Sequence, residues 1–203
     1  LKPLDLVPVL SYLFLNGRCR YCGSHISAQY PIVELATGAL FGAAAVVHGL
    51  SLTALHHVIL GSLLIVAAST DINTGLIPDL VTLPGMAVGL ILSFFVPGMT
   101  TTQSLLGVLA CGGLLWLLAI ASRGGMGGGD IKLMAMMGAF LGPWEGLLAL
   151  FIGALLGSVV GVAGMAVGRI KRRQTMPFGP FLAVGGVISM LAGNRILSIL
   201  LSR

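Results

Sequence analysis

Six apolar stretches of membrane-spanning length occupy most of this sequence. They lie at roughly 31–49, 51–70, 80–97, 103–122, 146–168 and 179–201. A helix that crosses the hydrocarbon core of a bilayer needs about 20 apolar residues, and each stretch is close to that length. Because only 8% of the residues are charged, the chain cannot coat the surface of a soluble globule. We therefore expect an all-α polytopic membrane protein with about six full transmembrane helices.

Two segments fall outside this pattern. Ile131–Leu141 is apolar but only about 11 residues long, which suits a short helix shielded from lipid by its neighbours. Residues 1–30 are more polar and contain prolines and a cysteine pair, so they are expected to form a small region outside the membrane. The sequence thus predicts two parts, an N-terminal region over residues 1–30 and a transmembrane domain over residues 31–203.

Basic residues indicate how the chain is oriented. Alternating spans place the Lys and Arg residues of the loops on one side of the membrane: Arg18, Arg20, Arg123, Lys132, Arg169, Lys171, Arg172 and Arg173. The opposite loops, near residues 48–53, 97–102 and 142–146, contain neither Lys nor Arg. The positive-inside rule therefore places residues 1–30 in the cytoplasm. This parity requires the short helix at 131–141 to cross or nearly cross the membrane.

In so apolar a chain, each of the six acidic residues needs an explanation. Four are assigned to the N-terminal region, to an outer loop or to the start of a span: Asp5, Glu34, Glu145 and Asp79. The remaining two are Asp71, which follows an apolar run, and Asp130, which follows three glycines. Between them the chain crosses the membrane outward and back. Span counting therefore returns both carboxylates to the same cytoplasmic edge.

Two carboxylates that face each other a few ångströms apart do not both ionise easily, so they share one proton. One acts as base toward a water that attacks a peptide carbonyl, while the other protonates the carbonyl oxygen or the leaving amine. The loop of Gly127, Gly128 and Gly129 has no Cβ atoms and would let an extended substrate approach Asp130. Taken singly, Asp71 fits an ordinary helix-end carboxylate and Asp130 fits an N-cap. Taken together, they predict the catalytic pair of an aspartic peptidase.

The sequence lacks the motifs of several other chemistries. It contains neither the serine elbow G-x-S-x-G nor the zinc pattern H-E-x-x-H, and residues 124–132 fit no nucleotide-binding glycine motif. Its basic residues are few and have no interleaved aromatic residues, which argues against nucleic acid as a partner. A proton-coupled transporter that uses the aspartates as a relay remains open. A non-enzymatic scaffold would rely on small helix faces such as Gly153, Gly157 and Gly161, which we expect to form helix contacts.

Several segments, in the same order along the chain, resemble the type IV prepilin peptidases. Gly127–Lys132 (GGGDIK) resembles the GxGD element of this family, and Thr70–Asp79 (TDINTGLIPD) resembles its first aspartate segment. Parts of residues 8–34 look like the family's cytoplasmic region, and Pro177–Phe181 (PFGPF) looks like its late loop. The similarity covers nearly the whole chain.

This resemblance implies that the catalytic aspartates are Asp71 and Asp130 and that Asp79 starts a helix. It implies an endopeptidase that cleaves the basic leader of prepilins and pseudopilins just after a glycine, at the cytoplasmic face, with no cofactor for proteolysis. Many members also methylate the new N-terminus with S-adenosylmethionine. The implied location is a bacterial inner or plasma membrane, and the implied clients are subunits of pili, type II secretion or DNA-uptake machinery.

The cysteines depart from the family's pattern. Members with both activities usually have a preceding transmembrane helix and two C-x-x-C pairs, whereas this chain has only Cys19 and Cys22. A structural zinc site needs four ligands. We expect Cys19 and Cys22 to be half of a zinc site, with the partner pair and the helix upstream of Leu1 and with His25 as an alternative third ligand. A reduced, incidental pair is the other interpretation, and Cys111, within a span, is expected to be a buried small hydrophobe.

The remaining polar residues are given no catalytic role. His48, His56 and His57 lie toward the outer half of the first two spans, away from both aspartates, and are expected to pack between helices or at the interface. The basic cluster at 169–173 is expected to anchor the topology. The loop Pro177–Phe181 is a candidate for shaping the cleft.

Overall fold

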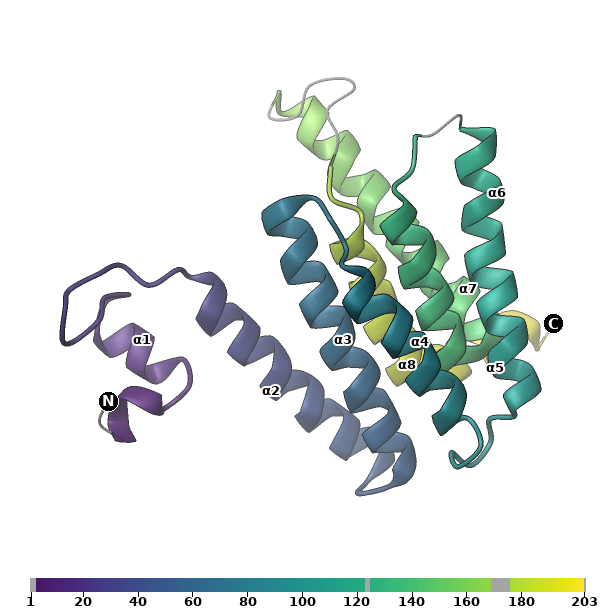
Figure 1. Cartoon of the computed structure of the whole chain (residues 1–203), viewed down its shortest axis with the longest axis horizontal. Helices are drawn as coiled ribbons and strands as arrows, with labels where there is room; N and C mark the ends of the chain where they lie inside the picture. The colour runs from purple at the N-terminus through teal and green to yellow at the C-terminus, as the bar shows by residue number, and fades with distance from the viewer. Residues whose placement is uncertain (1–2, 123–124, 169–175, 203) are drawn as a thin grey trace.

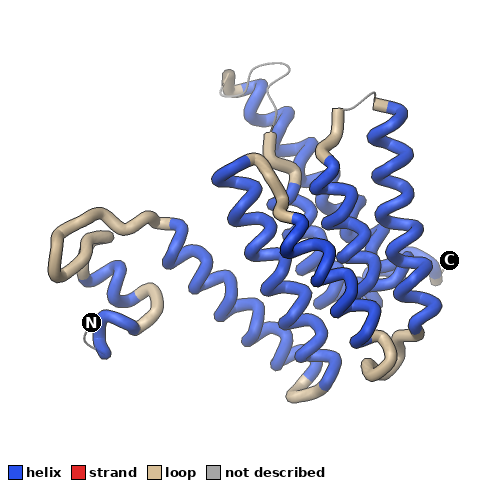
Figure 2. The backbone as a smooth tube through the Cα atoms, in the orientation of Figure 1, coloured by secondary structure: helices blue, strands red, loops and turns tan. Residues whose placement is uncertain are grey.

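The computed structural model describes residues 3–122, 125–168 and 176–202. Within these ranges all regular elements are helical, and the one pairing of extended backbone is an isolated bridge between Arg18 and His25. Figures 1 and 2 show a bundle of helices with the N-terminal region set to one side. The all-α prediction is confirmed. The following basic residues lie outside the described residues: Arg123, Arg169, Lys171, Arg172 and Arg173.

The helices follow one another in chain order. The N-terminal region contains a 3₁₀ turn, η1 (Pro3–Leu6), and a short helix, α1 (Leu10–Phe14). The membrane domain comprises α2 (Gln29–His48), α3 (Leu52–Thr74), α4 (Asp79–Leu92), α5 (Thr101–Gly107), η2 (Val108–Gly112), α6 (Gly113–Ala121), α7 (Gly128–Ala166) and α8 (Gly179–Leu201). The π-helical turn η2 joins α5 and α6 into one helix of 21 residues. With that helix counted once, the described part of the chain has five helices that are long and apolar enough to cross a membrane.

The predicted span at 80–97 is shorter in the structure. Helix α4 begins at Asp79 but ends at Leu92, after 14 residues. The chain then tightens into a turn in which the N–H of Phe95 bonds to the carbonyl oxygen of Leu92. Pro97 disfavours helical backbone in the residue before it, so the helix does not continue to the predicted end.

Helix α7 reverses direction at Gly142. This residue has φ 73° and ψ −176°, a backbone conformation that residues with a Cβ rarely adopt. A Cβ placed on Gly146 would lie only 3.5 Å from the Cα of Gly138, so the chain folds back on itself here. The first half of α7, residues 128–141, rises about 21 Å and so spans most of a hydrocarbon core of about 30 Å. It is the short helix that the sequence predicts at 131–141.

The prediction that Glu145 lies in an outer loop is wrong. Pro143 follows Gly142 directly, and proline suits the first position of a helix because it has no N–H to leave unpaired. The second half of α7 therefore starts without a loop, and Glu145 is a half-buried residue of its first turn. The hydroxyl of Ser189 in α8 donates a hydrogen bond of 2.7 Å to the backbone carbonyl of Glu145.

Because successive helices run in alternating directions, their ends lie at two levels of the bundle. We call the level of residues 74, 79, 128 and 179 the proximal end, and the level of residues 52, 92, 101 and 142 the distal end. Figure 1 shows α3, α6 and α7 reaching the proximal end at the top of the view. Because the first half of α7 runs from the proximal to the distal end, the two halves together keep the parity that the sequence requires.

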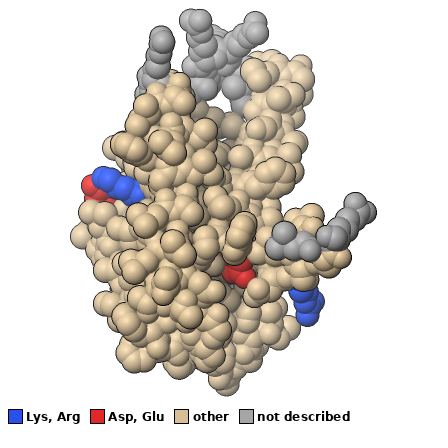
Figure 3. Space-filling model, turned by 90° about the vertical axis from the view of Figure 1, so that its right-hand side faces the viewer, with Lys and Arg blue, Asp and Glu red and all other residues tan. Residues whose placement is uncertain are grey.

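The sides of the bundle are apolar, as contact with lipid requires. Large apolar side chains are exposed around it, among them Val46, Leu80 and Phe151. Figure 3 shows one such face, on which Lys, Arg, Asp and Glu occupy few positions. An exposed apolar surface of this extent is rare in soluble monomers. The chain is a multi-pass membrane protein.

Two acidic residues hold the N-terminal region together. Asp5 forms an ion pair of 2.9 Å with Arg20 across this region. Glu34, in the second turn of α2, accepts a hydrogen bond of 2.8 Å from the backbone N–H of Val9. These contacts tie the region to the start of α2, so both carboxylates have structural partners far from the distal end.

Glycines let the helices approach closely at the centre of the bundle. A Cβ on Gly153 of α7 would lie 2.9 Å from the carbonyl oxygen of Phe181 in α8, and a Cβ on Gly157 would lie 3.5 Å from the Phe181 ring. A Cβ on Gly161 would lie 3.7 Å from the Met176 side chain, shortly before α8. The prediction that this glycine face forms helix contacts is confirmed. Helix α7 also packs against α4, α5 and η2, which makes it the central element of the fold.

The contact between Gly107 of α5 and Gly138 of α7 predicts a sensitive position. A Cβ on Gly138 would overlap the backbone carbonyl of Gly107, and backbone cannot move aside as a side-chain end can. We expect Gly138→Ala to destabilise the protein by about 1–3 kcal/mol, a typical cost of overpacking. Gly113→Ala is the matched control, because no atom lies within 4 Å of a Cβ at that position. Thermal unfolding in detergent measures both, and equal melting temperatures would contradict the close packing.

Candidate active site

Asp71 lies in the last turn of α3 and is buried, with 6% of its surface exposed. Its Oδ2 atom accepts a hydrogen bond of 2.9 Å from the backbone N–H of Gly179, the first residue of α8. The N-terminus of a helix presents unpaired N–H groups and a partial positive charge, both of which favour a negatively charged carboxylate. Asp71 is therefore more than an ordinary carboxylate at a helix end.

Gly179 allows this contact because it has no side chain. A Cβ at this position would lie 2.8 Å from Oδ2 of Asp71 and 3.2 Å from its Cγ. Any larger residue would push the carboxylate away from the N–H that binds it. The segment Pro177–Phe181, which the sequence offers as a candidate for shaping the cleft, therefore lies directly against Asp71.

Asp130 lies in the first turn of α7 and is half-buried. Helix α7 begins at Gly128 and its N-cap is Gly127, so the interpretation of Asp130 as an N-cap is wrong. The reason is that Gly128 and Gly129 adopt helical backbone, so the helix starts at Gly128, three residues before the predicted start at Ile131. The N–H of Asp130 bonds to the carbonyl oxygen of Gly127 at 3.2 Å.

The structure brings the two predicted aspartates together at the proximal end. Asp71 comes from the end of α3 and Asp130 from the start of α7. Their carboxyl groups lie close enough for their charges to interact. Gly127 and Gly128 beside them are exposed, and no atom lies within 4 Å of a Cβ placed on Gly128. The backbone next to Asp130 is thus open to an approaching chain.

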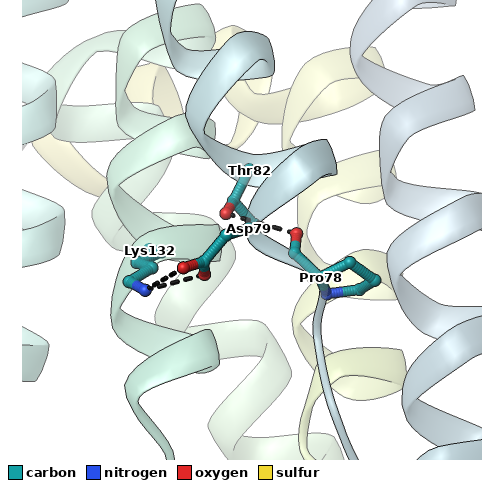
Figure 4. A network of polar contacts seen from close by, with 4 residues as sticks. All are labelled: Pro78, Asp79, Thr82 and Lys132. Atoms are coloured by element: carbon teal, nitrogen blue, oxygen red, sulfur yellow. Dashed lines mark hydrogen bonds and ion pairs between the residues drawn. The ribbon is translucent and has the colours of Figure 1, made fainter.

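An ion pair connects the start of α4 to the start of α7. The Nζ of Lys132 donates to both carboxylate oxygens of Asp79 at 2.7 Å, as Figure 4 shows. In the same view the hydroxyl of Thr82 points to the backbone carbonyl of Pro78, at 3.5 Å. Asp79 is the first residue of α4, in agreement with the predicted helix start. From the sequence, Lys132 is predicted only to help orient the chain in the membrane and to belong to the GGGDIK motif, so its bond to Asp79 is not expected.

Cys19 and Cys22 occupy a tight turn in the N-terminal region. The N–H of Cys19 bonds to the carbonyl oxygen of Ser24 at 2.9 Å, and the Cys22 sulfur lies 3.0 Å from the Ser24 hydroxyl oxygen. Hydrogen bonds from the Ser24 side chain and backbone, followed by one from Cys19, lower the pKa of the Cys22 thiol. A thiolate is the form that binds metals.

The described residues contain no complete zinc site. Among them no group of three or more His, Cys, Asp or Glu side chains has an arrangement that would hold a metal ion. His25, the alternative third ligand, does not complete such a group with the two cysteines. Zinc at Cys19 and Cys22 therefore stays a prediction. Cys111 is fully buried in the bundle, as expected of a small hydrophobe.

His48, His56 and His57 lie at the distal end, away from both aspartates. The ring centroids of His48 and His57 are 4.4 Å apart, and His56 stacks on Phe140 with centroids 4.8 Å apart. All three histidines line a cavity of about 640 Å³, together with Glu145. His56 and His57 are buried between helices and His48 is half-buried, in agreement with the predicted packing or interfacial roles.

Comparison with known proteins identifies the family. Residues 58–162 match the sequence profile described as "Type IV leader peptidase family". The chain belongs to this family. Residues 1–48 also match the profile described as "Bacterial Peptidase A24 N-terminal domain". The residues that match this leader peptidase family include the GxGD segment and both aspartates. The predicted class of enzyme is confirmed, and the transporter alternative gains no support.

Three relatives of this leader peptidase carry the name "Prepilin leader peptidase/N-methyltransferase". The protein of Bacillus subtilis (strain 168) is 41% identical over 203 residues, which cover 98% of this chain and 80% of the relative. That of Burkholderia pseudomallei (strain 1026b) is 39% identical, with 96% of this chain and 64% of the relative covered. That of Neisseria gonorrhoeae is 37% identical over 198 residues, with 94% and 67% covered. No solved structure matches the chain.

The lowered pKa of Cys22 predicts its reactivity in the leader peptidase. A thiol with a lowered pKa becomes a thiolate at lower pH, so alkylation of Cys22 should reach half its maximal rate at a lower pH than alkylation of a free cysteine. Ser24→Ala removes the hydroxyl hydrogen bond and should move this midpoint upward. Mass spectrometry of chelator-treated protein labelled across a pH series measures the midpoint. An unchanged midpoint in Ser24→Ala would contradict the assigned cause.

Proposed function

We propose that this leader peptidase cleaves the basic leader of prepilins or pseudopilins just after a glycine, with Asp71 and Asp130 as its catalytic pair. The observation that carries the proposal is the meeting of Asp71, at the end of α3, and Asp130, at the start of α7, at one end of a membrane bundle. The names of the relatives support the class of substrate. The exposed glycines beside Asp130 support access of an extended peptide.

The surroundings of the two aspartates suggest their separate roles. The N–H of Gly179 and the N-terminus of α8 favour a charged carboxylate at Asp71, so we assign Asp71 as the base. It takes a proton from water while the water oxygen bonds to the carbonyl carbon of the scissile peptide. Asp130, as the acid, gives its proton to the carbonyl oxygen. When the carbon–nitrogen bond breaks, Asp71 gives its proton to the departing nitrogen, and Asp130 takes the proton of one hydroxyl as the new carboxylic acid forms, so the pair again holds one proton.

The position of the pair suits a substrate that is itself partly embedded in lipid. The apolar helix of a prepilin can partition into the bilayer beside the enzyme while its basic leader remains in water. The junction between the two parts then lies at the edge of the membrane. Asp71 and Asp130, at the proximal helix ends, are at a matching level.

We infer that the protein lies in the inner or plasma membrane of a bacterial cell and that its proximal end faces the cytoplasm. Arg18, Arg20 and Lys132 support this orientation, because positively charged loops remain on the cytoplasmic side. Residues 1–30 would then form a cytoplasmic region and residues 31–203 the membrane peptidase domain. The matched N-terminal profile, which extends to residue 48, includes α2 with that region.

Substitution of either aspartate tests the proposal directly. In proteoliposomes with a purified prepilin, we expect Asp71→Asn and Asp130→Asn each to slow leader cleavage by roughly 10²–10⁴-fold, the typical contribution of a general acid or base. Glu145→Gln is the matched control, since it makes the same change to a half-buried carboxyl at the distal end. Gel shift of the prepilin measures the rate. Normal cleavage by a folded Asp71→Asn or Asp130→Asn variant would refute the pair.

A second activity is supported by the relatives' names, which include N-methyltransferase. We propose that the same protein transfers a methyl group from S-adenosylmethionine to the new N-terminus of the cleaved prepilin. A mass measurement of the mature pilin, after reaction with and without S-adenosylmethionine, tests this activity separately. A mature pilin without the added mass of one methyl group would reject it and leave the peptidase proposal intact.

A further inference from the structure

The ion pair between Asp79 and Lys132 has no part in the proton transfers described above. We propose that it positions Asp130 opposite Asp71, so that Asp79 and Lys132 are positioning residues of the peptidase. This inference rests on the proposed function, because it assumes that Asp130 reacts with the substrate.

The start of α7 has little of its own to hold it in place. Its N-cap, Gly127, has no side chain with which to cap the helix, and the next two residues are also glycines. Glycine loses more conformational freedom on folding than any other residue, so a glycine-rich first turn is easily disordered. Within that turn, the N–H of Asp130 bonds to the carbonyl of Gly127 at 3.2 Å, and the Asp130 carboxylate accepts a hydrogen bond from the backbone of Gly127. These bonds tie Asp130 to Gly127 within the same turn, so contacts with other elements must place that turn relative to Asp71.

One such contact comes from Ile77, in the segment that joins α3 to α4, and another from Asp79, the first residue of α4. A Cβ on Gly129 would lie 3.0 Å from the Cβ of Ile77, so this glycine rests directly on the segment. Lys132 then reaches the carboxylate of Asp79 with two bonds of 2.7 Å, which restrict rotation more than one bond would (Figure 4). Asp79 is itself favourably placed, at the positive N-terminus of α4.

These contacts, together with a short stretch of chain, connect the two aspartates through few residues. Asp71 is in the last turn of α3, and residues 75–78 connect that turn to Asp79. Lys132 joins Asp79 to α7, two residues after Asp130. Residues two apart on a helix point in different directions, so Lys132 can hold α4 while Asp130 faces Asp71. The distance between the aspartates is thereby set by a few residues rather than by the whole bundle.

Because the Asp79–Lys132 ion pair is exposed, an effect on catalysis can be distinguished from an effect on folding. The Lys132 and Asp79 side chains are 41% and 56% exposed, and exposed ion pairs contribute little to folding. Removing the pair should therefore leave the protein folded. A small displacement of a catalytic group, in contrast, slows a reaction strongly. We expect a loss of rate without a comparable loss of thermal stability.

Charge exchange between the two residues is the test. We expect Asp79→Lys and Lys132→Asp each to lower kcat for prepilin cleavage roughly tenfold, with KM changed by less than about twofold. The double variant, which restores an ion pair with its charges exchanged, should recover kcat to within about threefold. If a charge reversal fails to insert, the neutral variants Asp79→Asn and Lys132→Gln each test the loss of kcat that follows removal of the pair. Arg195→Glu, a charge reversal on an exposed residue near the distal end, is the matched control.

Three outcomes would overturn the inference. Folded single variants with normal kcat would show that the pair is an ordinary surface contact. A double variant as slow as the singles would show that the pairing is not what matters. A rise in KM with unchanged kcat would place the pair against the substrate instead. If Asp130→Asn itself cleaves normally, the proposed function fails, and that result is independent of the charge exchange.

Discussion

The hydrogen bond from Gly179 to Asp71 is the interaction on which the arrangement of the site depends. It joins the end of α3 to the start of α8, across a separation of 108 positions in the chain. A buried carboxylate near lipid is costly unless its charge is compensated, and the N-terminus of α8 supplies both an N–H donor and a favourable dipole. The absence of a Cβ at Gly179 is what allows the donor to approach.

The rest of the bundle keeps α8 and α7 in the positions that this contact needs. Gly153 packs on the backbone of Phe181 and Leu182, so α7 lies close against the first turns of α8. The reversal at Gly142 then returns the chain to the proximal end, where its second half can meet α8 while its first half presents Asp130. Close helix contact, a sharp reversal and a helix N-terminus thus combine to place two carboxyl groups in one site.

Much of this arrangement follows from the sequence, and the exceptions have clear physical reasons. Span lengths and the scarcity of charge predict the all-α membrane fold, and span counting predicts that Asp71 and Asp130 share one end. The role of Gly179 is not visible in that way, because its donor is a backbone group present in every residue except proline. The predicted position of Glu145 is wrong because the helix starts again at Pro143 without a loop. The length of a loop cannot be read from the apolar pattern alone.

The central claim is that Asp71 and Asp130 act as one catalytic pair, and binding of a transition-state analogue tests it most directly. A peptide with the sequence of a prepilin cleavage junction, and a hydroxyl-bearing carbon in place of the scissile carbonyl, imitates the tetrahedral intermediate. We expect the wild-type protein and Glu145→Gln to bind this peptide equally, and Asp71→Asn and Asp130→Asn each to lose most of the affinity in calorimetry. Wild-type affinity in either aspartate variant would contradict it.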